Sequence, residues 1–135
     1  FIRILEKSIM NKRIFEGLVS VIQPSSFVDY RGELWTTWKE DEWDYPIKFN
    51  HDKVSTSRKN VIRGLHGDTK SWKLATCLHG ELYYVVVDYR KNSPTYLQWD
   101  WVMLSQHNKK MVLVPPYFVN DFCVINLPLN GMIRE

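Results

Sequence analysis

The sequence predicts an all-β fold, and a double-stranded jelly roll fits its length of 135 residues. Short segments rich in β-branched and aromatic residues recur roughly every 8–12 residues, separated by clusters of Gly, Pro, Asn and Ser. No segment carries a convincing helical period. Aromatic residues make up 14% of the chain, which favours strands over a helical bundle. The length allows one domain with a hydrophobic core and is too short for two ordinary ones.

The clearest predicted element is a pair of strands at 73–88. Apolar residues alternate along its first half, Gly80 marks a kink, and a β-branched and aromatic run follows. We expect a loop at 90–94, a polar turn at 105–109 and a loss of strand character at Pro128. The other expected strands are 14–22, 27–38 with a turn at Arg31-Gly32, 49–55, 60–65, 95–104, 111–114 and 118–127.

Composition and charge exclude several classes of protein. The net charge of +3 is not concentrated, and its basic residues form short pairs, so we expect no nucleic-acid partner. No apolar run approaches the roughly 20 residues that a membrane helix needs, so we expect no membrane partner. Cys77 and Cys123 show no metal or disulfide spacing, which is typical of reduced thiols in a cytoplasmic protein.

The first nine residues look like an addition to the domain. Met10 precedes Asn-Lys-Arg as a natural start would, so we expect residues 1–9 to be an upstream or non-native extension. Residues 10–135 then form the single jelly-roll domain.

The most informative stretch is 61–73, because three chemically distinct side chains lie close together in it. The guanidinium of Arg63 suits a phosphate, since it donates parallel hydrogen bonds. The imidazole of His66 suits proton transfer near neutral pH. Lys73 can neutralise an oxyanion. These residues predict a site for a phosphorylated substrate that loses a proton beside a carbonyl group, although each alone is also common on a solvated turn.

A larger set of motifs falls in the order of a known family. The set comprises Phe27-x-Asp-x-Arg-Gly32, Ser55-x-Ser57, Asn60-Val-Ile-Arg-Gly-Leu-His66, Lys73-Leu74, Gly80, Val87-Asp-x-Arg90, Ser93-Pro-Thr95 and Val114-Pro-Pro-x-Phe118. It resembles the nucleotide-sugar 3,5-epimerases typified by dTDP-4-dehydrorhamnose 3,5-epimerase, over about residues 14–125. The resemblance implies a cupin-like jelly roll, a homodimer, and a nucleotide-diphosphate sugar as substrate.

Carried over by position, the resemblance implies a role for each site residue. His66 is the catalytic base, Lys73 steadies the enolate oxygen, and Arg63 grips the diphosphate. Arg31 reaches the diphosphate, from a neighbouring subunit. The remaining substrate-binding positions are His51, Lys53 and Asn120, the last standing where the family often has a histidine.

The chemistry fits these residue types. A 4-keto group acidifies the hydrogens on C3 and C5, so a neutral imidazole can remove one while a cation stabilises the oxyanion. Reprotonation from the opposite face inverts the carbon, and no cofactor is needed. The metal signature of cupins, two histidines one residue apart, is absent from His66-Gly67-Asp68, so we expect no metal.

The sequence departs from the family pattern towards its end. The family places an acidic tyrosine about thirteen residues beyond the Asn120 position, and here that position is Ile133. The family's further C-terminal segment, with an aspartate that orients the catalytic histidine, is not matched, and Asp121 replaces a usual glycine. We therefore expect proton abstraction by His66 to persist and full epimerisation to be slowed.

The leading interpretation is an isomerase that inverts C3, C5 or both of a nucleotide-linked 4-keto-6-deoxy sugar, for the synthesis of lipopolysaccharide or other surface glycans. Two alternatives stay open. One is a 3,4-ketoisomerase on the same scaffold. The other is a non-catalytic or decayed nucleotide-sugar-binding jelly roll, which the missing tyrosine favours.

Two aromatic pairs bear on packing. Tyr83 and Tyr84 alternate on one predicted strand, so one faces the interior and the other the opposite side, and the sequence does not reveal which. We expect Trp99 or Trp101 in the core.

Overall fold

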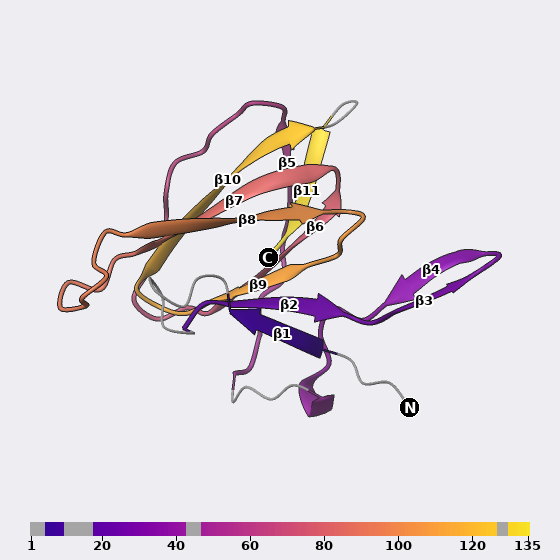
Figure 1. Cartoon of the computed structure of the whole chain (residues 1–135), viewed down its shortest axis with the longest axis horizontal. Coiled ribbons are helices and arrows are strands. Elements are labelled where there is room, and N and C mark those ends of the chain that lie inside the picture. Colours follow the sequence, from indigo (N-terminus) through magenta and orange to yellow (C-terminus); the bar gives the residue numbers. More distant parts are fainter. Residues whose placement is uncertain (1–4, 10–17, 43–46, 127–129) are drawn as a thin grey trace.

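The computed structural model describes residues 5–9, 18–42, 47–126 and 130–135, and the strands dominate it (Figure 1). Among these residues, no helix is long and apolar enough to cross a membrane. The all-β prediction is confirmed. The elements are β1 (Leu5–Ile9), β2 (Ser20–Pro24), β3 (Ser26–Asp29), β4 (Gly32–Trp35), the short 3-10 helix η1 (Glu40–Glu42), β5 (Val54–Arg58), β6 (Lys73–His79), β7 (Glu81–Asp88), β8 (Trp99–Ser105), β9 (Met111–Val114), β10 (Phe118–Asn126) and β11 (Asn130–Arg134).

Two antiparallel sheets form the body. The larger has the strand order β1-β2-β9-β6-β11-β5, and the smaller has the order β10-β7-β8. β6 and β7 follow each other in sequence but lie in different sheets, and Gly80 makes the turn between them with a φ of 93°. Only glycine adopts that conformation without strain, which explains the kink that the sequence predicts there.

The core lies between the two sheets, and the alternation of β7 fills it from one side. Leu82, Tyr84 and Val86 are fully buried, whereas Tyr83 faces outward and stacks on Trp101 with 4.9 Å between the ring centroids. The facing residues come from both sheets. They are Ala75, Cys77, Leu104, Val112, Val114, Phe118, Phe122, Val124 and Ile133, with Val19 beside them.

A second apolar cluster covers the outer face of the larger sheet. Ile22, Met111 and Leu113 are fully buried there, beneath side chains that include Trp38 and Phe49. Every residue of β9 is therefore buried, on one face or the other. Such double burial explains why this strand is a continuous apolar run and not an alternating one.

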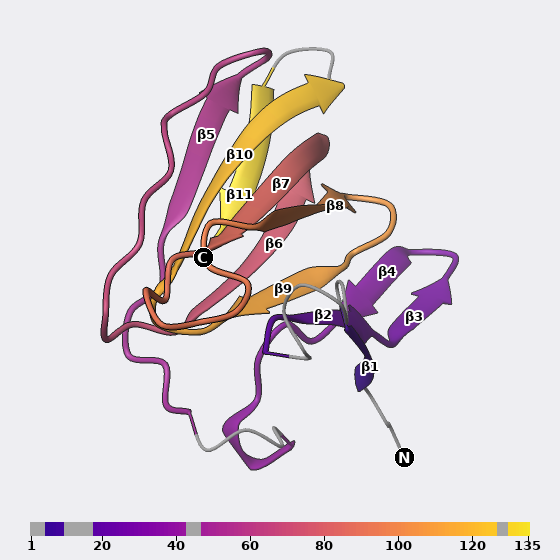
Figure 2. The ribbon, with the colours of Figure 1, turned by 60° about the vertical axis from the view of Figure 1, so that its left-hand side comes forward.

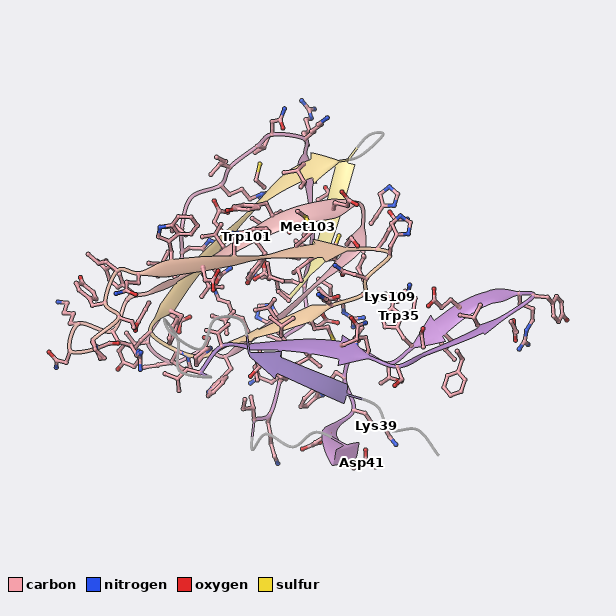
Figure 3. All side chains as sticks on the ribbon, in the orientation of Figure 1. Trp35, Lys39, Asp41, Trp101, Met103 and Lys109 are labelled. Carbon is pink, nitrogen blue, oxygen red and sulfur yellow. The ribbon has the colours of Figure 1, made fainter. Side chains whose placement is uncertain are left out.

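The β3–β4 hairpin projects from the body as a separate two-stranded ribbon (Figures 1 and 2). The predicted turn at Arg31-Gly32 is confirmed, since Asp29 pairs with Gly32 across it. Lys109 ties the base of the ribbon to the body (Figure 3): its Nζ lies 2.8 Å from a Glu33 carboxylate oxygen and 5.0 Å from the centre of the Trp35 ring. The rest of the ribbon has no such tie in the described residues.

Several predicted strand limits shift. The strand expected at 49–55 starts only at Val54. Residues 60–65 form no strand, because Asn60 and Gly64 have positive φ values of 65° and 93°, and Ile62 contacts β10 only through an isolated bridge with Cys123. The strand expected from Thr95 begins at Trp99. The prediction for 14–17 lies outside the described residues.

The late start of β8 has a clear cause in the buried carboxylate of Asp88. Arg90 donates to it from Nε at 2.9 Å and Nη2 at 2.8 Å, Ser93 donates from Oγ at 2.7 Å, and Thr95 donates from Oγ1. Burial alone would raise the pKa of Asp88, but these hydrogen bonds together hold it well below its usual value. The loop 89–98 thus folds around one anion and does not extend the strand.

The prediction that strand character is lost after Pro128 is wrong for 130–134. β11 pairs with β5 on one side and with β6 on the other, so both neighbours supply its backbone hydrogen bonds. Ile133 at its centre is fully buried. At the other end of the chain, residues 5–9 of the expected extension form β1, which pairs with β2.

The tryptophan prediction is also wrong. Trp99 and Trp101 are 55% and 46% exposed, because they lie on the outward face of β8, whereas Leu104 on the opposite face is fully buried. Figure 3 shows Trp101 on the outer side of β8. The alternation of the strand is real, but the large aromatic residues are on its outer side.

Replacing Asp88 by Asn should destabilise the fold by about 3 kcal/mol at pH 7, because Arg90 loses its buried anionic partner. A carboxylate with a depressed pKa in the folded state stabilises above its unfolded pKa, and this stabilisation is lost as the pH falls through the folded value. The parent should thus lose stability between about pH 5 and pH 2 more steeply than D88N. Urea unfolding at a series of pH values measures this difference; equal slopes would contradict the assignment.

Candidate active site

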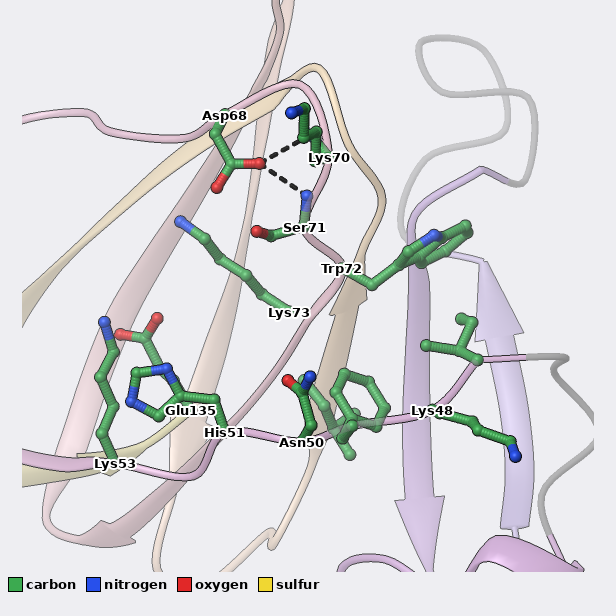
Figure 4. Close-up of a pocket in the computed structure, with 13 residues that line it drawn as sticks. Lys48, Asn50, His51, Lys53, Asp68, Lys70, Ser71, Trp72, Lys73 and Glu135 are labelled. Atoms are coloured by element: carbon green, nitrogen blue, oxygen red, sulfur yellow. Dashed lines mark hydrogen bonds between the residues drawn. The ribbon is translucent and has the colours of Figure 1, made fainter.

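A cavity of about 460 Å³ opens where β6 begins. Its walls come from the segment 47–53, the loop 68–72 and the C-terminal end of the described chain (Figure 4). These three parts are far apart in sequence. The packing of Phe49 in the outer cluster and two backbone hydrogen bonds between Lys53 and Glu135, at 3.0 and 3.1 Å, bring them together.

Lys73 is the half-buried cation of this cavity. Its Nζ donates to Asn120 Oδ1 at 3.1 Å. Burial lowers the pKa of Lys73, and the positive charge of Lys53 lowers it further, while the carboxylates of Glu135 and Asp68 oppose these effects. Figure 4 shows Lys73, Lys53 and Glu135 directed into the same space. An ammonium group held in this way can meet an oxyanion without a large desolvation cost.

His66 and Lys73 both form hydrogen bonds with Asn120. The backbone N–H of His66 donates to Asn120 O at 3.1 Å, and Asn120 N–H donates to His66 O at 3.0 Å. Residues directly opposite each other in an antiparallel pair direct their side chains to the same face. The imidazole therefore shares a face with the Asn120 amide, which in turn contacts Lys73.

The orientation of the His66 ring fixes which nitrogen is basic. Nδ1 lies 3.1 Å from the carbonyl oxygen of Gly64. A carbonyl only accepts, so Nδ1 carries the proton and Nε2 keeps the lone pair. The Gly64 carbonyl thus does the orienting that the family resemblance assigns to an aspartate.

The loop that carries His66 is held at two further points. Asp121 Oδ2 accepts a hydrogen bond from Gly64 N–H at 2.9 Å. Gly67 has no room for a side chain, since a Cβ there would lie 2.5 Å from the Phe118 carbonyl oxygen. Asp121, which departs from the family pattern, therefore has a structural role that sequence reasoning missed.

Asp68 closes the turn after the histidine. Its Oδ1 accepts from the backbone N–H groups of Lys70 at 2.7 Å and Ser71 at 2.6 Å (Figure 4). These bonds, with a smaller contribution from the charge of Lys73, lower the pKa of Asp68 to about 2. The turn is thus an anion-capped loop that fixes the approach to Lys73.

The other predicted site residues are divided in space. His51 and Lys53 line the cavity. Arg63 lies beside β5, where Nε donates to Ser57 Oγ at 2.8 Å and Nη2 donates to Thr56 O at 2.6 Å. Arg31 lies outside the cavity, at the end of the β3–β4 ribbon, where it pairs with Asp29 at 2.6 Å.

The cavity contains two groups that the sequence-based site lacks. Glu135 lines it because β11 continues into backbone pairing with Lys53, and nothing in the local sequence indicates that pairing. Trp72 lines it on the side away from Lys53 and Glu135 (Figure 4), and Ile47 and Leu74 are further apolar lining residues. The position of Trp72 directly before Lys73 is the only sequence feature that points to it.

Among the described residues, no group of three or more His, Cys, Asp or Glu side chains is placed to hold a metal ion.

Similarity to known proteins decides the family. A sequence profile described as dTDP-4-dehydrorhamnose 3,5-epimerase matches residues 15–128. The chain belongs to that family. The dTDP-4-dehydrorhamnose 3,5-epimerase of Escherichia coli K12 is 36% identical over 115 residues, which are 80% of this chain and 62% of that protein. That of Methanothermobacter thermautotrophicus is 34% identical over 126 residues, 85% of this chain and 68% of that protein.

Solved structures of 3,5-epimerases share the fold. The enzyme from Sulfolobus tokodaii superposes with a TM-score of 0.85 at 27% identity, covering 98% of this chain and 74% of that one. The dTDP-6-deoxy-D-glucose-3,5-epimerase from Legionella pneumophila, in complex with dTDP-4-keto-L-rhamnose, gives a TM-score of 0.84 at 30% identity, covering 96% of this chain and 70% of that one. The predicted cupin-like jelly roll is thereby confirmed.

The role of Asp121 can be tested on the His66 ring directly. In the parent, ¹⁵N NMR above neutral pH should show the Nδ1–H tautomer of His66, because the Gly64 carbonyl accepts that proton. Asp121→Ala releases Gly64, so the tautomer preference should weaken towards that of free imidazole, with a loss of about 1–3 kcal/mol in stability. The exposed His107 provides the reference spectrum. An unchanged His66 tautomer in D121A would contradict this role.

Proposed function

We propose that this chain carries the site of a nucleotide-sugar epimerase, which inverts C3, C5 or both of a nucleotide-diphosphate 4-keto-6-deoxy sugar. One observation carries the proposal: Asn120 pairs with the backbone of His66 and accepts a hydrogen bond from the ammonium of Lys73, which lines the cavity. A base and a cation at this spacing fit proton abstraction beside a carbonyl group. The dTDP-4-keto-L-rhamnose in the complex of the Legionella pneumophila relative supports the same class of ligand.

The first step uses His66 as the base. The lone pair of Nε2 takes the proton from C3 or C5, the C–H electrons form a double bond to C4, and the keto oxygen becomes an enolate anion. The ammonium of Lys73 donates a hydrogen bond to that oxygen. The lowered pKa of Lys73 places its N–H closer in acidity to the enol, which strengthens that bond.

The charge of the cavity suits a diphosphate. Lys53, His51 and Lys48 line it together with Lys70, and Asp68 and Glu135 offset part of the charge. Arg63 does not line the cavity, and its Nε and Nη2 donate to Ser57 and Thr56, so we assign to a phosphate oxygen only its Nη1 group. We assign these cations to the diphosphate and leave the aromatic half of the cavity to the sugar or the base.

We infer a homodimer in which Arg31 serves the partner's cavity. The ribbon exposes large apolar side chains, with Val28 75% and Tyr30 97% exposed. A surface of this kind on a projecting hairpin favours burial against a second copy.

The free thiols of Cys77 and Cys123 support a cytoplasmic location, where surface-glycan precursors would be modified.

A second candidate function is binding of the nucleotide sugar without epimerisation. Ile133, at the position of the family's acidic tyrosine, is fully buried in the core and has no proton to give. Reprotonation from the opposite face then depends on another donor or on water.

Solvent exchange separates these functions. In D₂O, with a dTDP- or GDP-linked 4-keto-6-deoxy sugar, we expect deuterium at C3 or C5, followed by NMR. His66→Asn should lower the exchange rate by about 10²–10⁴-fold, because the base is lost. His107→Asn, at an exposed turn, should leave the rate unchanged.

The stereochemistry of the product completes this experiment. Deuterium with inversion supports an epimerase, whereas deuterium with retention supports a base without an opposing acid. Bound sugar with no exchange would overturn the epimerase in favour of the binding protein. Product with the keto group moved to C3 would instead support a 3,4-ketoisomerase.

Subunit mixing tests the role of Arg31. Arg31→Ala and His66→Asn should each be nearly inactive alone. An equal mixture should recover about a quarter of the parent rate, because half of the dimers are mixed and one of their two sites is intact. Recovery after co-refolding, followed by the same exchange assay, is the measurement. If the mixture stays as inactive as its components, Arg31 does not act across the interface.

A further inference from the structure

Tyr84 lies beneath the proposed site and has no role in the chemistry described so far. It and Asn120 are both fully buried, on the inward faces of neighbouring strands. Phe122 lies opposite Tyr84 and Asn120 lies opposite Val86 in the β7–β10 register. Tyr84 and Asn120 are therefore diagonal neighbours on one face, a spacing within reach of an aromatic side chain.

The side-chain amide of Asn120 has a partner for its oxygen but, among the described residues, none for its nitrogen. The ammonium of Lys73 can only donate, so Asn120 directs Oδ1 to it and turns Nδ2 away. Asn120 Nδ2 is buried and donates to no acceptor in the described part of the chain. An amide held by one bond alone can rotate and lose its contact with Lys73.

Two further buried atoms near Asn120 are also unmatched. The Tyr84 hydroxyl and Glu135 Oε2 have no hydrogen-bond partner among the residues that the structure describes. Both Asn120 and the Glu135 carboxylate act on the Tyr84 hydroxyl. The Tyr84 hydroxyl and the Asn120 amide are thus neighbours inside the core, and Glu135 lines the cavity that Lys73 also lines.

A tyrosine hydroxyl is the only one of these groups that can both accept and donate. It can accept from Asn120 Nδ2 and donate its own proton to the Glu135 carboxylate. Burial raises the pKa of Tyr84 well above its ordinary value, so the hydroxyl keeps its proton at the pH of the reaction. The donors and acceptors then match in sequence: ammonium to amide oxygen, amide N–H to phenol oxygen, phenol O–H to carboxylate.

We propose that Tyr84 is a positioning residue, which locks the Asn120 amide and thereby holds the Lys73 ammonium at the place of the developing oxyanion. The benefit to catalysis rests on the proposed function. The contact from Tyr84 through Asn120 to Lys73 does not, and it is testable without any substrate.

The neighbouring residue supplies a matched control. Tyr83 is on the outward face of the same strand, stacked on Trp101. Tyr83→Phe and Tyr84→Phe each remove one hydroxyl and keep the ring. Only the second change removes the acceptor for Asn120 Nδ2.

The test is a pH titration of lysine labelled with ¹³C at Cε, with the Lys73 signal assigned by its loss in Lys73→Met. Removing the Tyr84 hydroxyl should free the amide, weaken the hydrogen bond to the charged amine and lower the Lys73 pKa by at least about half a pH unit. The Lys70 signal should not move. The charged and titratable groups that face Lys73 are Lys53, Asp68, Glu135 and, through Asn120, His66 and Tyr84.

A double variant separates this contact from general disturbance. Asn120→Ala alone should lower the Lys73 pKa at least as much, and adding Tyr84→Phe to it should have no further effect. An unchanged Lys73 titration in Y84F would overturn the proposal, as would additive shifts in the double variant. If Y84F fails to fold, ¹H NMR of the parent replaces it: a nuclear Overhauser effect between the Tyr84 hydroxyl proton and the Asn120 Nδ2 protons is expected, and its absence overturns the proposal.

With an active enzyme, the same variants give a second result. Y84F should lower kcat with little change in KM, because the oxyanion contact forms in the transition state. One combination of results separates the two proposals. If Y84F lowers the Lys73 pKa but the parent shows no solvent exchange with the sugar, the positioning role stands and only the proposed function is overturned.

Discussion

The backbone pair between His66 and Asn120 is the contact on which the candidate site depends. The segment before β6 forms no strand, so two hydrogen bonds to β10 fix where its histidine lies. Because the partner in that pair also accepts from Lys73, one residue of the smaller sheet sets the spacing of base and cation. The loop gains its order from tertiary contacts, and not from its own conformational preference.

The sandwich buries two neighbouring polar groups within an otherwise apolar interior. Along β7, Tyr84 lies between the buried Leu82 and Val86, and along β10, Asn120 lies between the buried Phe118 and Phe122. Polar groups buried in this way are costly unless they are matched. Tyr84 and Asn120 lie together, next to Lys73 and its cavity. The free-energy cost of burying polar groups is therefore confined to the part of the sandwich where chemistry is proposed.

The sequence allowed much of this fold to be predicted, because alternation and glycine placement are local properties. The strand pair at 73–88 and its kink at Gly80 are examples. Three features required tertiary information: the late start of β8, which follows from the Asp88 anion; the strand β11, which its two neighbours stabilise; and the outward position of Trp101. In the site, motifs located Lys73 and His66, whereas Glu135 and Asp121 act through partners that are more than 50 residues away in sequence.

The two thiols of this chain differ in burial. Cys77 is buried, its Sγ donates to backbone carbonyls, and burial raises its pKa to about 11. Its nucleophilic thiolate is thus scarce near neutral pH. Cys123 is only half-buried and faces Ile62 across the isolated bridge that tethers the histidine loop. Alkylating reagents would therefore modify Cys123 before Cys77. A probe attached to Cys123 would report on the segment that carries His66.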